Sequence, residues 1–496
     1  MTGRMWLLVL DGADAPARSG SVAPVIDPST GTAFATCAMG GADDVEAAVH
    51  SASVAQERWA ALVPAERGRV LARMARELRD HADELAVLET RNTGKPLRES
   101  RFDVASAARY FEFYAGAVDK IGGHTIPLGE EYLSYTRREP FGVVGVIVPW
   151  NAPLQQAARS VAPALAAGNA VVLKPDEHTP LTALRLGRLA VRAGLPAGLL
   201  NVVPGHGTEA GAAVVAHPAI GKVFFTGSLA VGRIVAAGAA ARVAPVGLEL
   251  GGKSPHIIFE DADILSASQD AVTAITLNTG QVCSAGSRLL VHESIIDQVQ
   301  AEVCTRMEAL TVGPGERDPD VGPLTTAEQF ETVLAHLRRA RSDGATVALG
   351  GGAVTDAGLP AGYYVQPTVL SNVPPTAAVL REEVFGPVLT VQPFSTDEEA
   401  IALANGTDYG LVAGIWTRDL TRAHRVAARL DAGQVFVNEY FAGGEETPFG
   451  GRRFSGYGRE KGLEALEHYQ QSKTVTIRLR AASAGIDEER NAHGSS

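Results

Sequence analysis

The sequence predicts an α/β protein with parallel β-sheets. From about residue 143 to 250, short apolar runs alternate with helix-like stretches, and the alternation resumes with different residues from about 252 to 451. Strands that alternate with helices in this way form βαβ units, whose strands are parallel. The chain has 496 residues, and because one hydrophobic core rarely grows beyond about 300 residues, we expect roughly two to four domains or subdomains.

The expected elements follow one another in a clear order. Helical spacing of apolar residues covers 43–88, with a break at Pro64, and then 98–118. Residues 131–148 are rich in β-formers and are interrupted by Pro140. The βαβ elements that follow are strand 143–148, helix 154–167, strand 170–174, helix 180–193, strand 199–203, a short helix, strand 222–228 and a helix from 231. A late strand is expected at 474–479, before a polar tail, 483–496, that we expect to be disordered.

Composition argues against several classes of protein. The formal net charge is -12 and no dense Lys/Arg block is present, so nucleic-acid binding is not expected. No apolar run approaches the roughly 20 residues that span a bilayer, and Asp11 interrupts the apolar N-terminal stretch, so we expect no membrane insertion and no signal peptide. The cysteines Cys37, Cys283 and Cys304 are too widely spaced for a disulfide framework or a zinc site, which fits a metal-free protein of the cytoplasm.

Three residues are candidates for chemistry. Cys283 lies in NTGQVCSAGSR, a loop-like setting that suits a nucleophile, whereas Cys304 lies in an apolar helical pattern typical of a structural cysteine. Glu249, in GLELGGKSP, is either a salt-bridged carboxylate at a strand end or a general base with a shifted pKa. Asn151, in PWNAP, either donates its amide hydrogens to an oxyanion or forms an Asx turn before Pro153.

Three segments at successive strand ends are candidates for a dinucleotide site. Pro204–Gly211 formally matches GxGxxA and follows a predicted strand. Phe225–Gly232 opens a helix with Ser228 as its expected N-cap, and helix N-termini favour phosphate. Lys174–Glu177 places a cation beside a carboxylate, which suits ribose and phosphate oxygens. Each segment alone could be only a turn, but their succession favours a cofactor.

Seven motifs occur in an order that points to one family. PWNAP, KPDEHTP, FTGS, ELGGKSP, GQVCSAGSR, EEVFGPV and PFGGRRFSGYGRE run as in the NAD(P)-dependent aldehyde dehydrogenase superfamily, which the chain resembles from about Ser21 to Leu479. The resemblance implies a Rossmann-type NAD-binding domain from 1–121 and 141–251, an α/β catalytic domain at 252–451, and a small β-rich oligomerisation element from 122–140 and 470–482. It also implies a homodimer or homotetramer, because strands of this element pair across subunits in the family.

The resemblance also implies residue roles. The family's catalytic cysteine matches Cys283, its general base matches Glu249, and its oxyanion amide matches Asn151. The expected NAD contacts are Val148, Pro149, Trp150, Lys174, Glu177, Gly207, Gly211, Gly227, Ser228, Gly232, Leu250, Glu383 and Phe385. We expect NAD to be preferred over NADP, because Glu177 would accept hydrogen bonds from the ribose 2′-OH and repel a 2′-phosphate.

The implied reaction is oxidation of an aldehyde to a carboxylic acid. The Cys283 thiolate attacks the aldehyde, hydride passes to the nicotinamide, and water activated by Glu249 hydrolyses the resulting thioester. A branch of the family that transfers the acyl group to coenzyme A is a second hypothesis, although that branch typically lacks the carboxylate at Glu249. A redox-independent thiol esterase and a cofactor-binding protein without catalysis are two further hypotheses.

The helix after PWNAP indicates a substrate class. Gln155 and Arg159 lie at helical spacing and can share one face. Arg159 offers a forked donor for a carboxylate or a phenolic oxygen, or else forms a salt bridge between domains or subunits. Tyr440 and Phe441 could supply an aromatic wall. We therefore expect an aromatic or carboxylate-bearing aldehyde.

Overall fold

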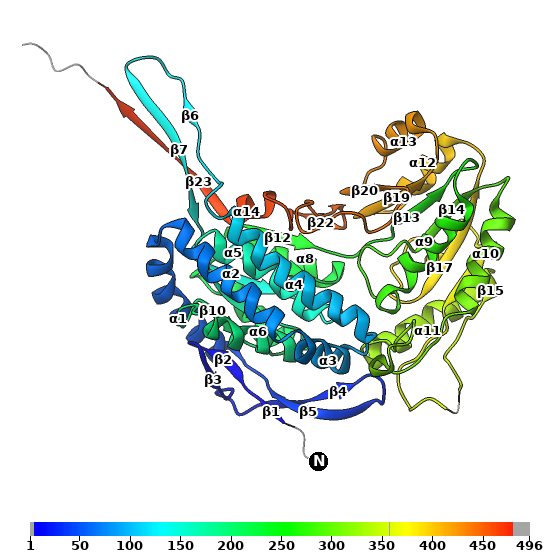
Figure 1. Cartoon of the computed structure of the whole chain (residues 1–496), viewed down its shortest axis with the longest axis horizontal. Coiled ribbons are helices and arrows are strands. Elements are labelled where there is room, and N and C mark those ends of the chain that lie inside the picture. The colour runs from blue at the N-terminus through cyan, green and yellow to red at the C-terminus, as the bar shows by residue number, and fades with distance from the viewer. Residues whose placement is uncertain (1–3, 357, 480–496) are drawn as a thin grey trace, which may run out of the picture.

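Two α/β lobes and a projecting arm make up the chain (Figure 1). The computed structural model describes residues 4–356 and 358–479. The expected tail, 483–496, and residues 480–482 of the expected oligomerisation element lie outside the described residues. The α/β fold class predicted from the sequence is confirmed, because strands and helices alternate through both lobes.

The first lobe is built on a mostly parallel sheet. Its strand order is β22 (Gly456–Tyr457), β12 (Val246–Glu249), β11 (Ile220–Thr226), β8 (Val143–Ile147), β9 (Ala170–Lys174), β10 (Leu200–Val202), β2 (Leu8–Leu10) and β3 (Ala13–Ala15). Neighbours from β12 to β10 are parallel, whereas β22, β2 and β3 are antiparallel additions at the edges. Every residue of β8 and β9 is buried, which explains their continuous apolar sequences.

Helices cover both faces of this sheet. One face carries α1 (Ala42–Ala61), α7 (Ala212–Ala216) and α8 (Leu229–Ala240), and the other carries α5 (Pro153–Ala166) and α6 (Leu181–Arg192). An outer layer against α5 and α6 consists of α2 (Pro64–Asp80), α3 (Ala82–Thr93) and α4 (Leu97–Ala117). The break expected at Pro64 is the start of α2, where the missing N–H of proline is tolerated.

The second lobe repeats this architecture. Its strand order is β15 (Thr346–Leu349), β16 (Thr368–Ser371), β17 (Val388–Phe394), β14 (Arg288–His292), β13 (Pro255–Ile258), β19 (Val412–Trp416) and β20 (Gln434–Val437). Ile258 and Leu289 pack under α9 (Ile264–Thr276) and α10 (Ile296–Glu308). Their neighbours Ile257 and Leu290 pack under α12 (Asp397–Asn405) and α13 (Leu420–Ala427). Alternate residues thus face opposite cores, as the pleat of a strand requires.

The arm joins two segments that are far apart in the sequence. β7 (Tyr132–Pro140) pairs with β23 (Gln470–Arg478) along its whole length, and β6 (Thr125–Ile126) adds a third strand. Figure 1 shows the arm extending away from the first lobe. The two segments that the resemblance groups as one element therefore form one sheet.

The remaining elements are small. An N-terminal sheet contains β1 (Met5–Trp6), β5 (Thr32–Ala38) and β4 (Val22–Asp27), and a second small sheet contains β18 (Tyr409–Gly410) and β21 (Arg452–Arg453). Two further helices are α11 (Ala327–Ser342) and α14 (Glu464–His468). Across the described ranges, no helix combines the length and the apolar character needed to cross a membrane.

Candidate active site

Most of the predicted site residues lie at one edge of the first sheet. The carboxyl-terminal residues of β12 and β11, Glu249 and Thr226, are register partners, and Lys174 at the end of β9 pairs with Ile147 at the end of β8. Parallel strands bring their carboxyl ends to the same edge, where ligands bind in α/β sheets. The segment Val148–Asn151 follows β8 at this edge, and Gly227 and Ser228 follow β11.

Cys283 lies in a loop of unusual backbone conformation. The 3₁₀ turn before it, Leu277–Gly280, has left-handed φ values of 48° at Asn278 and 58° at Thr279. Gly280 follows with a φ of 73°, and a Cβ there would overlap the carbonyl of Gly386. Each left-handed non-glycine residue costs about 1–3 kcal/mol, and such strain is concentrated at functional sites.

Asn151 is bound directly to the Cys283 loop. Its Nδ2 donates to the Gln281 carbonyl at 2.8 Å, and Asn278 Nδ2 donates to the Asn151 carbonyl at 2.9 Å. Asn151 Oδ1 accepts no hydrogen bond from any described residue, so the Asx turn left open by the sequence is not formed. Among the described residues Nδ2 donates only to the Gln281 carbonyl, so its second hydrogen has no acceptor there.

Glu249 is a buried carboxylate without a hydrogen-bond partner in the described part of the chain. The residue is 2% exposed, and both carboxylate oxygens are buried and unpaired. Burial raises the pKa of Glu249 well above its usual value, and Glu460 raises it further, whereas Arg159 and Arg459 lower it. Glu249 is therefore not the salt-bridged carboxylate that was one of the two sequence-based interpretations. A raised pKa suits the other interpretation, a general base.

A double glycine brings Glu249 and Cys283 together. Residues 250–254 connect β12 of the first sheet to β13 of the second. A Cβ at Gly251 would overlap Glu383 Oε2, and a Cβ at Gly252 would lie 2.5 Å from the Cys283 carbonyl oxygen. The motif ELGGK thus needs both glycines because the linker passes between two buried groups.

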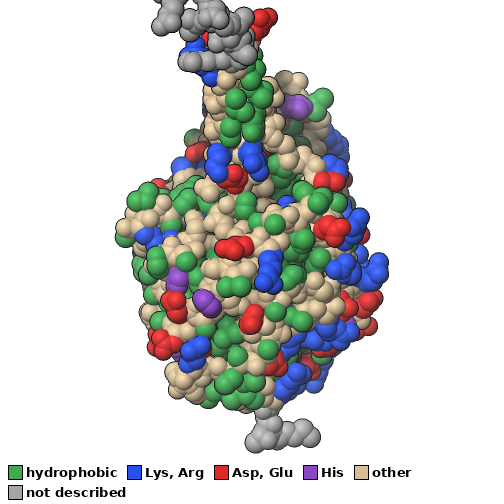
Figure 2. Space-filling model, turned by 90° about the vertical axis from the view of Figure 1, so that its left-hand side faces the viewer, with side chains coloured by type: hydrophobic (Ala, Val, Ile, Leu, Met, Phe, Trp, Pro, Cys, Tyr) green, Lys and Arg blue, Asp and Glu red, His purple; other side chains and the backbone are tan. Residues whose placement is uncertain are grey.

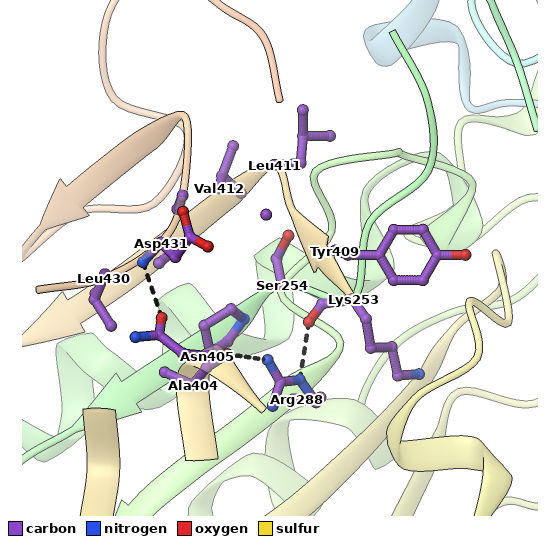
Figure 3. A pocket seen from close by; sticks show the side chains of 14 residues that line it. Lys253, Ser254, Arg288, Ala404, Asn405, Tyr409, Leu411, Val412, Leu430 and Asp431 are labelled. Atoms are coloured by element: carbon purple, nitrogen blue, oxygen red, sulfur yellow. Dashed lines mark hydrogen bonds between the residues drawn. The ribbon is translucent and has the colours of Figure 1, made fainter. Parts of the chain in front are cut away.

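Figure 3 shows how the far end of this linker is anchored. The Arg288 guanidinium donates to the Lys253 carbonyl at 2.8 Å and to the Leu403 and Ala404 carbonyls at 2.7 Å each. The last two carbonyls end α12, where a cation is favourable. The adjoining cavity has a volume of about 10 Å³, which is room for about one water molecule, so it does not hold the substrate.

The electrostatics of Cys283 favour the neutral thiol. Burial raises the pKa of Cys283 to about 12, Arg159 lowers it, and Glu383 and Glu249 raise it further. The thiol therefore has to lose its proton before its sulfur can act as a nucleophile.

The sequence did not single out Glu460, although it lies within the motif PFGGRRFSGYGRE. Glu460 is completely buried, accepts a hydrogen bond from Ser160 Oγ at 2.6 Å and forms an ion pair with Arg159. The salt bridge that the sequence left open for Arg159 is thus present, within the chain. The Arg159 guanidinium also lies 5.1 Å from the ring centre of Phe449.

Aromatic side chains surround Cys283. Phe436, Tyr440 and Phe449 form a buried cluster, against which Cys283 and Phe441 pack. Tyr440 donates its hydroxyl hydrogen to the Ser284 carbonyl at 3.1 Å, which fixes it behind the nucleophile. Gln155, the other residue predicted on the substrate side, is partly exposed at the start of α5.

The residues predicted to contact the adenosine half of NAD lie close together. Lys174 Nζ lies 2.9 Å from Glu177 Oε2, and His206 Nδ1 lies 3.4 Å from Glu177 Oε1. Ser228 caps α8 by accepting a hydrogen bond from the Val231 N–H at 3.3 Å. A Cβ at Gly232 would lie 2.6 Å from Leu250, so this glycine lets α8 pack against the linker.

The formal GxGxxA segment is crowded by the rest of the chain at Gly205 and not at Gly207 or Gly211. A Cβ at Gly207 or Gly211 would meet no atom within 4 Å, so neither position requires glycine for space. Gly205 does, because a Cβ there would overlap the Gly40 carbonyl. The start of α8 also suits a phosphate, since its first N–H groups have no intrahelical acceptors and only one of them, that of Val231, is bound by the Ser228 cap.

The residues predicted near the nicotinamide form a second group. The rings of Trp150 and Phe385 lie edge to face with centres 5.3 Å apart. Glu383 accepts a hydrogen bond from the Gly252 N–H at 3.0 Å. Burial raises the pKa of Glu383 to about 7, and Lys253 lowers it. An aromatic edge and a buried carboxyl fit a ring and a ribose, so the donor set fits the cofactor. Within the described residues, no group of three or more His, Cys, Asp or Glu side chains is arranged to hold a metal ion.

Comparison with known proteins agrees with this geometry. A model of the aldehyde dehydrogenase family matches residues 15–475. A Bacillus subtilis protein named as an aldehyde dehydrogenase, DhaS, is 42% identical over 476 residues, which cover 95% of each chain.

Solved structures extend the likeness to the whole fold. PnpE from Pseudomonas sp. WBC-3, solved with nicotinamide adenine dinucleotide, is 42% identical with a TM-score of 0.95 over 97% of this chain and 99% of PnpE. An indole-3-acetaldehyde dehydrogenase from P. syringae, AldA, solved with NAD+ and IAA, is 40% identical with a TM-score of 0.93 over 95% and 96%. The chain belongs to the aldehyde dehydrogenase family, as the order of its motifs predicted.

Proposed function

We propose that the protein oxidises an aldehyde to a carboxylic acid with NAD, through a thioester at Cys283 that water hydrolyses with Glu249 as general base. The observation that carries this proposal is the buried, unpaired Glu249 carboxylate, held next to the Cys283 loop by the double-glycine linker. A carboxylate in this setting has no hydrogen-bond partner among the described residues, and it can accept a proton from a water molecule.

The residues divide the work of the reaction. The Cys283 thiol gives up its proton to solvent, and the thiolate attacks the aldehyde carbonyl carbon. The Asn151 amide stabilises the oxyanion of the thiohemiacetal. NAD, when bound, supplies the hydride acceptor. Water then attacks the Cys283 thioester that remains while its proton passes to Glu249. The acid leaves, and Glu249 returns the proton to the Cys283 thiolate.

The first prediction separates the two chemical steps. Cys283→Ala should abolish aldehyde oxidation, because no other described residue replaces the nucleophile. Glu249→Gln should slow steady-state turnover by about 10²–10⁴-fold, as expected for loss of a general base. Stopped-flow NADH fluorescence and steady-state assays measure the two variants.

Cys304→Ala is the matched control, because Cys304 is a partly buried thiol on α10 outside this site. Near-normal turnover by Cys283→Ala would contradict the mechanism. NADH formation that requires coenzyme A and yields acyl-coenzyme A in place of the free acid would favour the acylating branch. Ester hydrolysis without any NADH from aldehydes would favour the esterase.

The second prediction concerns the choice of cofactor. The Glu177 carboxylate would repel a 2′-phosphate placed beside it, because both groups are negatively charged. Lys174 Nζ lies 2.9 Å from Glu177 Oε2 and offsets part of this repulsion. We expect a higher kcat/KM with NAD than with NADP. Glu177→Gln should lower the ratio of kcat/KM with NAD to kcat/KM with NADP, because the substitution removes the negative charge and keeps Lys174.

Glu209→Gln, an exposed carboxylate in the same region, should leave the ratio unchanged. The proposal of an NAD preference is wrong if the unmodified protein uses NADP as well as NAD.

The substrate class that the site favours is an aromatic aldehyde. The rings of Tyr440 and Phe441 lie edge to face at 4.9 Å, and both pack with Phe449 beside Cys283. A carboxylate on the substrate would have to compete with Glu460 for Arg159, and buried ion pairs are costly to break. The relative named indole-3-acetaldehyde dehydrogenase carries an aromatic substrate in its name.

The third prediction tests this class with phenylacetaldehyde, succinic semialdehyde and hexanal. Phenylacetaldehyde should give the highest kcat/KM. Phe441→Ala should reduce that value about 2–10-fold more than the value for hexanal, because an aromatic pair contributes about 0.5–1.5 kcal/mol beyond its area. Phe454→Ala, an exposed ring over Arg233, is the control. A higher kcat/KM for succinic semialdehyde than for phenylacetaldehyde would instead indicate that Arg159 binds the carboxylate of the substrate.

The fourth prediction is that the active form is a homodimer or homotetramer. Leu133 and Ile477 are register partners on one face of the arm and are 41% and 42% exposed. Figure 2 shows hydrophobic side chains running along the arm. Such an apolar surface on an extended sheet is typical of an interface between subunits.

Sedimentation at micromolar concentration should show a dimer or tetramer, and Ile477→Asp should dissociate it. Val54→Asp, an equally drastic change at an exposed position of α1, should not. A stable and fully active monomer of the unmodified protein would refute this prediction.

A further inference from the structure

A carboxylate from the first lobe reaches the strained turn that precedes Cys283. Glu99 lies in the first turn of α4, and its Oε2 accepts a hydrogen bond from the Asn278 backbone N–H at 2.9 Å. Asn278 is one of the left-handed residues of the turn, with φ 48° and ψ 35°. The bond therefore holds a backbone conformation that a non-glycine residue rarely adopts.

Asn278 also connects the oxyanion amide to the nucleophile. Its side chain donates to the Asn151 carbonyl at 2.9 Å and to the Gln281 carbonyl at 3.2 Å. Asn151 Nδ2 donates to the same Gln281 carbonyl at 2.8 Å. A rotation of Asn278 out of the left-handed region would break these contacts together, and would displace Cys283 and Asn151 relative to each other.

Glu99 lies near a buried ion pair. Lys95, which is 2% exposed, pairs with Asp103 one turn further along α4 at 2.5 Å. Burial raises the pKa of Glu99 to about 7, and Lys95 lowers it. Glu99 is partly exposed and its hydrogen bond to Asn278 is partly buried, so water screens this bond less than one on the surface.

We propose that Glu99 is a positioning residue that acts through Asn278 to hold the Cys283 loop and the Asn151 amide in their reactive arrangement. The proposal rests on the proposed function, because it assigns the role of nucleophile to Cys283. This role differs from a general contribution to the stability of the fold. Glu99 contacts the turn through one backbone N–H, so we expect its replacement to leave the core of each lobe unchanged.

The test compares Glu99→Leu with Glu99→Gln. Leucine removes the acceptor, whereas the glutamine carbonyl oxygen still accepts from the Asn278 N–H. The rate of Cys283 alkylation by iodoacetamide, read by peptide mass spectrometry, should fall about tenfold in Glu99→Leu and stay within about twofold in Glu99→Gln. The kcat for NADH formation should follow the same order, while the melting temperature and the Kd for NAD stay close to the unmodified values.

Glu112→Leu provides the matched control on the same helix. Glu112 is exposed and pairs with Arg79 at 2.8 Å, so its loss leaves the turn intact and both rates unchanged. A second arm uses Asn278→Gly, because glycine adopts left-handed conformations freely. In the Asn278→Gly background, Glu99→Leu should lower the alkylation rate and kcat by a smaller factor than it does alone. Glycine adopts the left-handed conformation without the hydrogen bond to Glu99.

Alkylation and kcat at unmodified levels in Glu99→Leu would overturn the proposal, as would equal losses in Glu99→Leu and Glu99→Gln. The proposal would also be overturned if Glu99→Leu lowered the alkylation rate and kcat by the same factor in the Asn278→Gly background as in the unmodified protein. Failure of the proposed function has a different signature: Cys283→Ala would remain active, whatever the alkylation rates in the Glu99 variants.

Discussion

The burial of one unpaired carboxylate, that of Glu249, is the constraint around which the site is arranged. An ionised carboxylate away from water is costly unless it is paired, and among the described residues this one has no hydrogen-bond partner, so burial raises its pKa well above the usual value. The chain accepts that cost at the carboxyl end of β12, where the linker to the second lobe begins. Gly251, Gly252 and Gly450 each leave room that a side chain would fill, and a Cβ at Gly450 would lie 2.7 Å from Glu249 Oε1. These glycines keep Glu249, Glu383 and Cys283 within one small volume.

Much of the fold followed from simple patterns in the sequence. The apolar runs 143–148 and 170–174 predicted buried parallel strands, and β8 and β9 are buried along their whole length. The order of the motifs predicted the family, which the family model and the relatives confirm. The roles of Cys283, Glu249 and Asn151 stay predictions, although the structure brings the three residues together at one site.

Other features could not be found from local sequence because they depend on long-range contacts. Arg159 has a helical spacing that suits a substrate contact, yet its guanidinium pairs with Glu460, which lies far along the chain. Glu99 reads as an ordinary acidic residue at a helix start, where it is favourable in any case. Its contact with Asn278 spans 179 positions and two lobes. The left-handed turn is marked only in part, because Asn278 and Gly280 are residue types that favour this conformation and Thr279 is not.

The most direct test of the central claim is to locate the acyl group during turnover. Glu249→Gln would be mixed with NAD and phenylacetaldehyde, quenched within the first turnover, digested and analysed by mass spectrometry. We expect the acyl mass on the peptide that contains Cys283, in an amount equal to the NADH formed, and no acyl mass on the peptides of Cys37 and Cys304. NADH formation without acylated Cys283 would contradict the account, because the acid would then arise by a route in which neither Cys283 nor Glu249 has the proposed role.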